Sequence, residues 1–252
     1  MPDDLLPHLA LVGAGLVAGA LNVIAGGGSF LTLPVLIFLG LPATVANGTN
    51  RIAILVQNAG AVAGFHRHRL IGGRRLLHSA APALVGAAFG TWMAIEIGDE
   101  AFRKLLAAIM VVVSLWTLWD PGAARGEEDG GREPRLGRTT LPLVFFAIGI
   151  YGGFVQAGVG FLILAATTLA GLDLVRGNAL KVAIILAFTP LTLTIFAWGG
   201  KVEWGMGAAL AVGNLAGGLV GVRLTVLKGH AWVKRVVTVA VIAFAILLWV
   251  VP

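Results

Sequence analysis

Two short polar segments, each ending in a basic residue, interrupt apolar stretches of this chain. They are Asn47-Gly48-Thr49-Asn50-Arg51 and, 131 positions further on, Asn178-Ala179-Leu180-Lys181. A cation inside a membrane span costs roughly 2.5–3.5 kcal/mol on insertion scales, so it usually faces a cavity or a partner. Between residues 5 and 119 the acids are Glu96, Asp99 and Glu100, all close to one loop. Cations without carboxylate partners favour a site for a small anion; the alternative is that Arg51 and Lys181 snorkel to lipid headgroups.

Glycine-rich breaks, each beside an amide side chain, form the second candidate feature. The first contains Asn22, Gly26, Gly27, Gly28 and Ser29, and the second contains Gln156, Gly158 and Gly160. Glycine costs about 1 kcal/mol relative to alanine inside a helix, so the helix should open at these breaks. A helix that starts at Ser29 would present backbone N–H groups and a positive dipole end, which suit an anion. The alternative is glycine packing with Ser29 as an N-cap.

Other polar residues point to no metal site and no catalytic set. His66 and His68 lack a third ligand and lie among arginines, so we expect a basic loop there. Gln57 and Asn58 fall in the middle of an apolar segment, where they either line the same path or bond between helices. No enzyme activity and no cofactor are predicted. The predicted substrate-binding set is Asn22, Gly26, Gly27, Gly28, Ser29, Asn47, Thr49, Asn50, Arg51, Gln57, Gln156, Gly158, Gly160, Asn178 and Lys181.

Composition places the chain in a lipid bilayer. It is 58% hydrophobic and 12% charged, with a mean hydropathy of +0.93, whereas soluble domains carry about 25% charged residues. The net charge of +6 fits basic loops on one membrane face, and no basic stripe with interleaved aromatics indicates nucleic acid. We therefore expect a multi-pass integral membrane protein that contacts lipids and binds no nucleic acid.

The chain also resembles itself at a shift of 131 positions. The matched landmarks are Phe30 with Phe161, Gly40-Leu41 with Gly171-Leu172, Asn47 with Asn178, Gly86 with Gly217, and Gly90 with Gly221. A three-residue gap after Asn22 also aligns Gly15, Gly19 and Asn22 with Gly149, Gly153 and Gln156. We predict a first membrane repeat over 1–119, a polar linker over 120–139 and a second repeat over 140–252. Duplicated membrane modules often place a binding site between their halves.

Each repeat offers five apolar segments. They are 5–24, 29–40, 45–65, 77–97 and 101–119, then 141–156, 160–171, 178–198, 204–227 and 232–251. The first two segments of each repeat are short for a full crossing, so each pair is predicted to turn back within the membrane. The expected fold is an all-α polytopic membrane protein with two inverted-topology repeats, each a broken or re-entrant helical hairpin plus three transmembrane helices.

Loop charge favours the inverted arrangement. With re-entrant hairpins, one face would carry the loops 66–75, 120–138, 173–176 and 228–235 with twelve Lys or Arg, and the other face three. With parallel repeats the split falls to nine against six. The positive-inside rule therefore places the basic loops in the cytoplasm and both termini outside it.

These motifs resemble the TauE/SafE family, the sulfite exporter and 4-toluene sulfonate uptake permease group. The resemblance rests on Gly15-x3-Gly19-x6-Gly26-Gly27-Gly28-Ser29-Phe30-x3-Pro34, on Gly40-Leu41-Pro42 with Ala46-Asn47-Gly48-Thr49-Asn50, and on a weaker second copy. It implies a permease of the bacterial inner membrane for sulfite, sulfonates or other small anions. The second copy departs from the glycine triplet at Val159.

The sequence thus predicts a secondary transporter for a small anion, with a sulfur oxyanion or organosulfonate first. The substrate would sit between the two hairpin tips and move by alternating access. Either a proton or a sodium ion could couple to it. Two alternatives stay open, a passive anion channel and a membrane scaffold subunit that transports nothing.

Overall fold

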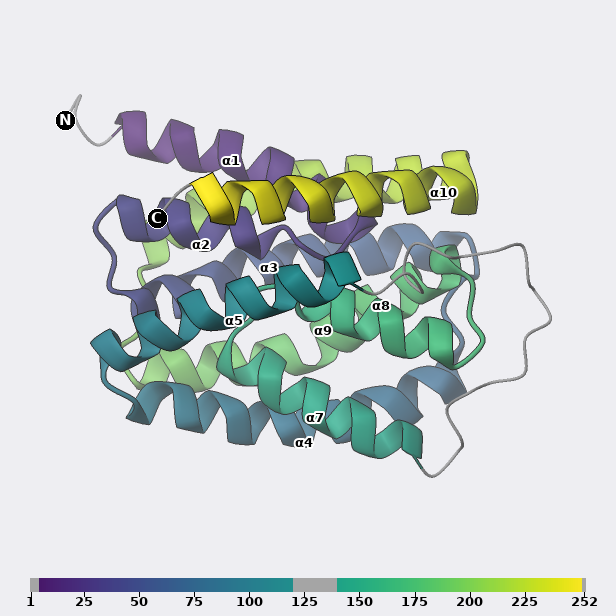
Figure 1. Ribbon diagram of the computed structural model, residues 1–252, viewed down its shortest axis with the longest axis horizontal. Coiled ribbons are helices and arrows are strands. Elements are labelled where there is room, and N and C mark those ends of the chain that lie inside the picture. The colour runs from purple at the N-terminus through teal and green to yellow at the C-terminus, as the bar shows by residue number, and fades with distance from the viewer. Residues whose placement is uncertain (1–4, 120–139, 251–252) are drawn as a thin grey trace.

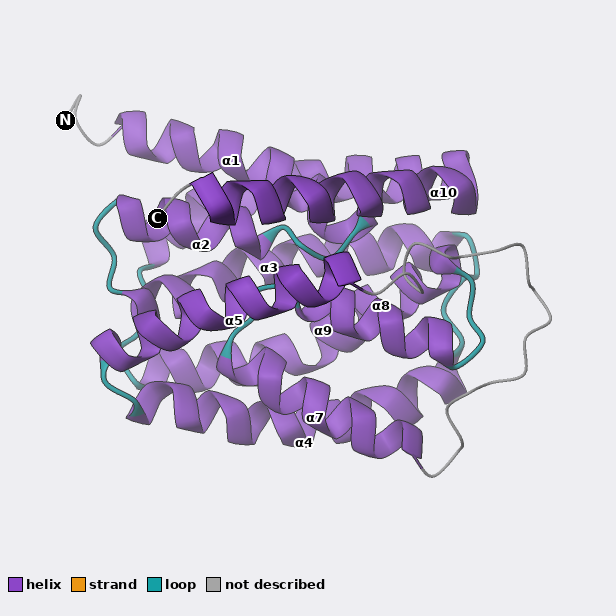
Figure 2. Ribbon diagram, viewed as in Figure 1, coloured by secondary structure: helices purple, strands orange, loops and turns teal. Residues whose placement is uncertain are grey.

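The structure, a computed structural model, describes residues 5–119 and 140–250, and within these ranges every regular element is a helix (Figure 2). The predicted linker, 120–139, lies outside the described residues. The helices are α1 (Leu5–Ile24), α2 (Ser29–Phe38), α3 (Ala43–Arg67), α4 (Gly73–Glu96), α5 (Asp99–Trp119), α7 (Thr140–Phe154), α8 (Val159–Leu169), α9 (Leu174–Trp198) and α10 (Trp204–Val250).

The helices confirm the all-α polytopic fold, and their ends lie within a few residues of the predicted segments. Among the described residues, three helices are long and apolar enough to cross a membrane by length and composition: Leu6–Ile24, Leu174–Trp198 and Trp204–Gly229. Helix α3 is less apolar because it carries the polar segment around Arg51, which is buried inside the protein. Its polar side chains are thus shielded by neighbouring helices, as a spanning helix requires.

Helix α10 is two helices that meet at Gly229. Gly229 has φ 69° and ψ −165°, a conformation that breaks helical geometry and that glycine adopts easily. The chain reverses there, and the yellow C-terminal limb returns along the body of the protein (Figure 1). The two limbs correspond to the predicted segments 204–227 and 232–251.

The first two helices of each half form hairpins whose turns lie inside the helical body. Helix α1 ends at Ile24 and α2 runs back from Ser29, while α7 ends at Phe154 and α8 runs back from Val159. Both connecting loops lie at mid-length of the molecule, away from its two ends (Figure 2). The predicted breaks are therefore present in both halves, at the same depth as the middle of the long helices.

The most extensive helix contacts join helices of opposite halves. Helix α1 packs along α10, and α7 packs along α4, so the first helix of each half lies against the fourth segment of the other. Glycines line both interfaces. A Cβ built on Gly217 would lie 2.0 Å from the Leu16 carbonyl oxygen, and one on Gly90 would lie 1.9 Å from that of Ile150. Small residues at these positions allow the two backbones to approach each other directly.

The connections divide between two ends of the molecule. The α3–α4 and α8–α9 loops and the bend at Gly229 lie at one end, on the right of Figure 1. The α2–α3, α4–α5 and α9–α10 loops lie at the other end with both chain termini (Figure 1). The described basic loops predicted to share a face therefore share one end, and Arg103, Lys104 and Lys201 lie at the opposite end.

Carboxylates cap the first turns of α3 and α9, the helices that carry Arg51 and Lys181. Asp99, at the start of α5, accepts hydrogen bonds from the Thr44 amide and hydroxyl at 2.9 Å each, which satisfies a free N–H in the first turn of α3. Asp173 does the same for α9, accepting from the amides of Val175 and Arg176 at 3.0 Å. Asp99 thus caps the helix that carries Arg51, and Asp173 caps the helix that carries Lys181.

We expect Gly90→Leu and Gly217→Leu each to destabilise the protein by about 1–3 kcal/mol, because the added side chain would force two backbones apart. The measurement is the midpoint of thermal unfolding in detergent. Gly13→Leu is the matched control, since a Cβ on Gly13 meets no atom within 4 Å. Equal midpoints for all three variants would contradict the packing described above.

Candidate functional site

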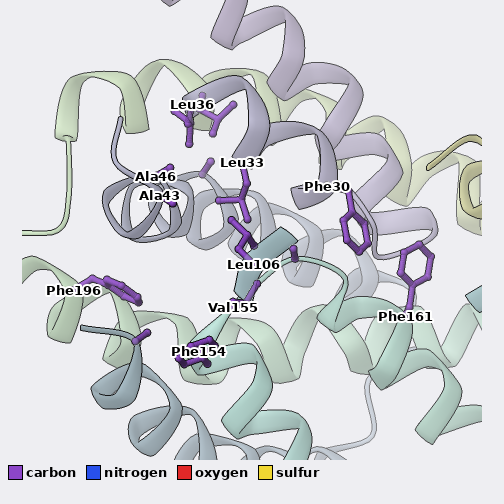
Figure 3. Close-up of a cluster of buried hydrophobic side chains, with 14 of the residues drawn as sticks. Phe30, Leu33, Leu36, Ala43, Ala46, Leu106, Phe154, Val155, Phe161 and Phe196 are labelled. Atoms are coloured by element: carbon purple, nitrogen blue, oxygen red, sulfur yellow. The ribbon is translucent and has the colours of Figure 1, made fainter. Parts of the chain in front are cut away.

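The two glycine breaks touch each other at the centre of the molecule. A Cβ built on Gly26 would lie 2.5 Å from the Gly160 carbonyl carbon, so the two backbones are in direct contact. Beside this contact, the rings of Phe30 and Phe161 stack with centroids 6.2 Å apart and planes 27° apart (Figure 3). Gly26, with φ 97°, and Gly158, with φ 73°, adopt the left-handed conformation that lets the chain leave one helix and enter the next.

Lys181 binds the carboxyl end of the first hairpin helix. Its side chain is fully buried, and Nζ donates to the carbonyl oxygens of Asn22 at 2.9 Å and Val23 at 2.8 Å. The third acceptor is Oδ1 of Asn178 at 2.7 Å. Asn178 in turn donates from Nδ2 to the Ile24 carbonyl at 2.9 Å. Helix α9 of the second half thus supplies the cap for α1 of the first half.

Arg51 makes the reciprocal contact with the second hairpin. Its buried guanidinium donates from Nη2 to the carbonyl oxygens of Gly152 at 3.2 Å and Gly153 at 2.6 Å. Nη1 donates to the Thr192 hydroxyl at 2.9 Å, and the guanidinium carbon lies 4.6 Å from the centre of the Phe196 ring.

Asn47, one turn earlier on α3, completes this second cap. Its Nδ2 donates to the Phe154 carbonyl at 2.9 Å, as Asn178 does to Ile24. Each half therefore contributes one asparagine and one cation, which together satisfy the last carbonyl oxygens of the other half's hairpin helix.

This geometry corrects two parts of the sequence interpretation. Arg51 and Lys181 are not unpaired cations beside helix N-termini; they are bound to carbonyl oxygens at helix C-termini, where a positive charge offsets the negative dipole end. Nor do they snorkel to a surface, because both side chains are fully buried. Their role toward a substrate stays a prediction.

Backbone N–H groups at the start of the return helices remain available. Within the described parts of the chain, the amides of Gly27 and Gly28 before α2, and of Ala157 and Gly158 before α8, donate to no acceptor. They precede the positive ends of α2 and α8, which attract negative charge. The predicted free N–H groups are thus present in both breaks, and their binding of an anion stays a prediction.

Several buried side-chain atoms near these breaks also have no partner among the described residues. They are Nε of Arg51, both amide atoms of Gln156, Nε2 of Gln57 and both amide atoms of Asn58. Gln156 is only 2% exposed and lies in the second break itself, where its backbone N–H points at Asn47 Oδ1 over a long 3.5 Å. Because an unsatisfied buried amide costs about 1–3 kcal/mol, such groups need an explanation.

The aligned amides Asn22 and Gln156 take different places. Asn22 is in the last turn of α1, and its Nδ2 donates to Oε1 of Gln57 at 3.2 Å. Gln156 lies beyond the end of α7. The two halves therefore differ at this position. In the first half the amide of Asn22 is hydrogen-bonded to Gln57, and in the second half the side-chain amide of Gln156 has no partner among the described residues.

Asn50 and Thr49 take two further positions. Asn50 accepts from the Thr32 hydroxyl at 2.8 Å and donates to that of Ser29 at 3.1 Å, so it fixes the start of α2. Thr49 faces away from the breaks, and its hydroxyl accepts from the Glu203 amide at 2.8 Å in the α9–α10 loop.

Two contact residues, Thr32 and Phe196, were missed by sequence reasoning. Thr32 follows Ser29 by three positions, which places both on one helix face and could have indicated it. Nothing in the sequence singles out Phe196.

The site carries an excess of positive charge. Arg51 and Lys181 are the buried charged side chains among the described residues, and no Asp or Glu in those ranges is buried. In the same ranges, no group of three or more His, Cys, Asp or Glu side chains could hold a metal ion. The arrangement is chemically suited to holding a negatively charged ligand by N–H donors.

We expect Asn47→Ala and Asn178→Ala to lower stability by similar amounts, about 1–3 kcal/mol each, because each leaves one buried helix-end carbonyl without its donor. Thermal unfolding in detergent measures the change. Thr194→Ala is the control, since Thr194 is exposed and bonds only within its own helix. A large effect at one asparagine with none at the other would contradict the reciprocal arrangement.

Comparison with known proteins agrees with this architecture. The family model described as "Sulfite exporter TauE/SafE" matches residues 11–248. A "Probable membrane transporter protein" of Haemophilus influenzae is 29% identical over 238 residues, covering 94% of this chain and 91% of the relative. "Probable membrane transporter protein ORF9" of Sinorhizobium sp is 27% identical, covering 97% and 94%. "Probable membrane transporter protein YfcA" of Escherichia coli K12 is 29% identical, covering 89% and 82%.

No solved structure matches the chain. The family model nevertheless spans nearly all of it, including both breaks and both buried cations. The chain is therefore an integral membrane protein that belongs to the sulfite exporter TauE/SafE family.

Proposed function

We propose that this membrane transporter moves a small anion, with a sulfur oxyanion or organosulfonate first, across the bacterial inner membrane. The observation that carries the proposal is the pair of buried cations, Arg51 and Lys181, with no buried carboxylate among the described residues. The family description supports the substrate class, and the relatives' names support a role in membrane transport without naming a substrate. Because the role is transport, no enzymatic reaction and no cofactor are proposed.

The charge balance supports an anionic substrate. Each cation costs roughly 2.5–3.5 kcal/mol at the centre of a bilayer, and its position at a helix C-terminus returns at most about 2 kcal/mol. Two cations buried in the same protein repel each other in a medium of low dielectric constant. A bound anion would lower this energy, so the protein gains most from a ligand that carries negative charge.

The unpartnered donors supply hydrogen bonds for such a ligand. Nε of Arg51, the amide of Gln156 and the N–H groups of the two breaks point to no acceptor within the described ranges. A sulfonate or sulfur oxyanion presents several acceptor oxygens around one centre, so it can satisfy donors that converge from different elements. We infer a binding position beside the Gly26–Gly160 contact, on the Arg51 and Gln156 side.

We further infer that the two halves have inverted orientations and rock against each other. The exchange of α1 and α7 between halves supports this, as does the antiparallel course of α3 and α9. That course is supported by the hydrogen bond from Arg51 to Thr192 near one end and by the hydrophobic cluster that contains both Phe65 and Ala179 near the other. A site whose caps come from opposite halves would change shape when the halves move, as alternating access requires.

The first test is direct uptake by purified protein in liposomes. We expect thiosulfate, sulfite or sulfoacetate to raise the unfolding midpoint in detergent, and at least one of them to be accumulated against its gradient when a proton or sodium gradient is imposed. A passive anion channel would allow only downhill flux, and a scaffold subunit would respond to none of the ligands. Either result would remove the proposal of secondary transport.

Gln156→Ala gives a sharper test of the site. Because both amide atoms of Gln156 lack partners in the described structure, the variant should keep its stability, whereas loss of one substrate hydrogen bond should weaken anion binding by about tenfold. Thr225→Val is the matched control, because it removes another buried unpartnered polar atom on α10 without touching a break. Unchanged anion affinity in Gln156→Ala would take Gln156 out of the site.

A further inference from the structure

The two reciprocal cations differ in one chemical property. An arginine side chain keeps its proton under all conditions that proteins meet, whereas a buried lysine can exist as an ammonium or as a neutral amine. The otherwise similar caps of α1 and α7 therefore contain one permanent charge, at Arg51, and one exchangeable charge, at Lys181.

The hydrogen-bond geometry around Lys181 matches the protonated form of its side chain. Nζ faces three acceptors: the carbonyl oxygens of Asn22 and Val23 and Oδ1 of Asn178, at 2.9, 2.8 and 2.7 Å. An ammonium has three N–H donors to match them. A neutral amine has two donors and a lone pair, which would point at one of these oxygens. Loss of the proton must therefore loosen the cap that ties α9 to the end of α1.

No acid close to Lys181 is available to balance its charge. The helices packed against α9 are α1, α3, α4, α7, α8 and α10. Their buried charged residue among the described ones is Arg51 alone, and the hydroxyl of Tyr151 on α7 donates to the Ala157 carbonyl. His8 lies at the far end of α1, and the remaining ionisable residues described on these helices lie at helix ends or on exposed faces.

We propose that Lys181 binds and releases the proton that is cotransported with the anion, an inference that rests on the proposed function. When the anion is bound, both Arg51 and Lys181 carry charge. When the anion leaves, Lys181 gives up its proton to water on the side where the anion is released, and a single buried charge remains. A monovalent anion then moves with one proton and no net charge, and a divalent anion moves with one net negative charge. By linkage, proton and anion each strengthen the binding of the other.

The experiment uses the wild-type protein in liposomes that contain a trapped pH-sensitive dye. The probes are 4-toluenesulfonate and thiosulfate, because neither takes up a proton near neutral pH and any proton movement must pass through the protein. We expect uptake of either anion to acidify the lumen. A pH gradient with the acidic side outside the liposomes should drive accumulation of the anion in the lumen. Membrane potential should affect thiosulfate uptake and leave 4-toluenesulfonate uptake unchanged.

The deciding variant is Lys181→Arg, which keeps the charge and removes the exchangeable proton. It should lose accumulation driven by a pH gradient by at least tenfold, and whatever anion exchange it still supports should move no protons. Lys104→Arg, on an exposed turn of α5, is the matched control and should behave as the wild type. Normal proton-driven accumulation in Lys181→Arg would overturn the proposal.

The wild-type measurement stands even if Lys181→Arg does not fold. Anion uptake without any proton movement would overturn the role of Lys181 and leave the transport proposal intact. No uptake of any tested anion by wild-type protein would remove the transport proposal itself, and the role of Lys181 with it.

Discussion

The structure depends on two cations that bind the carboxyl ends of helices from the opposite half of the chain. Lys181 and Arg51 donate to four carbonyl oxygens, those of Asn22, Val23, Gly152 and Gly153. Among the described residues, only the Gly153 oxygen has a further side-chain donor, the Thr91 hydroxyl at 3.0 Å. Backbone polar groups inside a membrane must be satisfied within the protein. A hairpin that turns back at mid-depth is therefore stable only if another element reaches its broken end, and Lys181 and Arg51 do so.

This solution has an electrostatic consequence. Helix dipoles carry only partial charges, so a full positive charge at each C-terminus more than neutralises it. The centre of the protein is left positive, with the amide ends of α2 and α8 adding to the same sign. Under the proposed function, the side chains that hold the fold together at the breaks are also the ones that attract the anion.

The glycine interfaces serve the same arrangement. Helix α1 lies against α10 and α7 against α4 at backbone contact, and these close approaches bring each hairpin within reach of the cation on the other half's long helix. The halves are consequently interlocked rather than side by side. Because each hairpin contacts both halves, a movement of one half relative to the other would also displace the hairpins.

The sequence was sufficient for the elements of this fold. Glycine runs predicted the two breaks, and the lengths of the apolar segments predicted the helices. The shift of 131 positions paired Asn47 with Asn178, and each of them donates to the last carbonyl oxygen of a hairpin helix in the other half. These features are local: helix propensity, hydrophobic length and residue type are written in consecutive positions. The three-residue gap in the alignment also paired Asn22 with Gln156, which lie in different environments, because a sequence alignment does not show where a helix ends.

Tertiary structure alone decided what the charged residues touch. From the sequence, Arg51 and Lys181 were cations without carboxylate partners, and an anion or a headgroup was the natural counterpart. Their partners are carbonyl oxygens more than a hundred residues away, an acceptor that every residue carries and that no side-chain pattern reveals. Which carbonyls are left without donors depends on where two distant helices stop and meet, and that is fixed by packing between the halves.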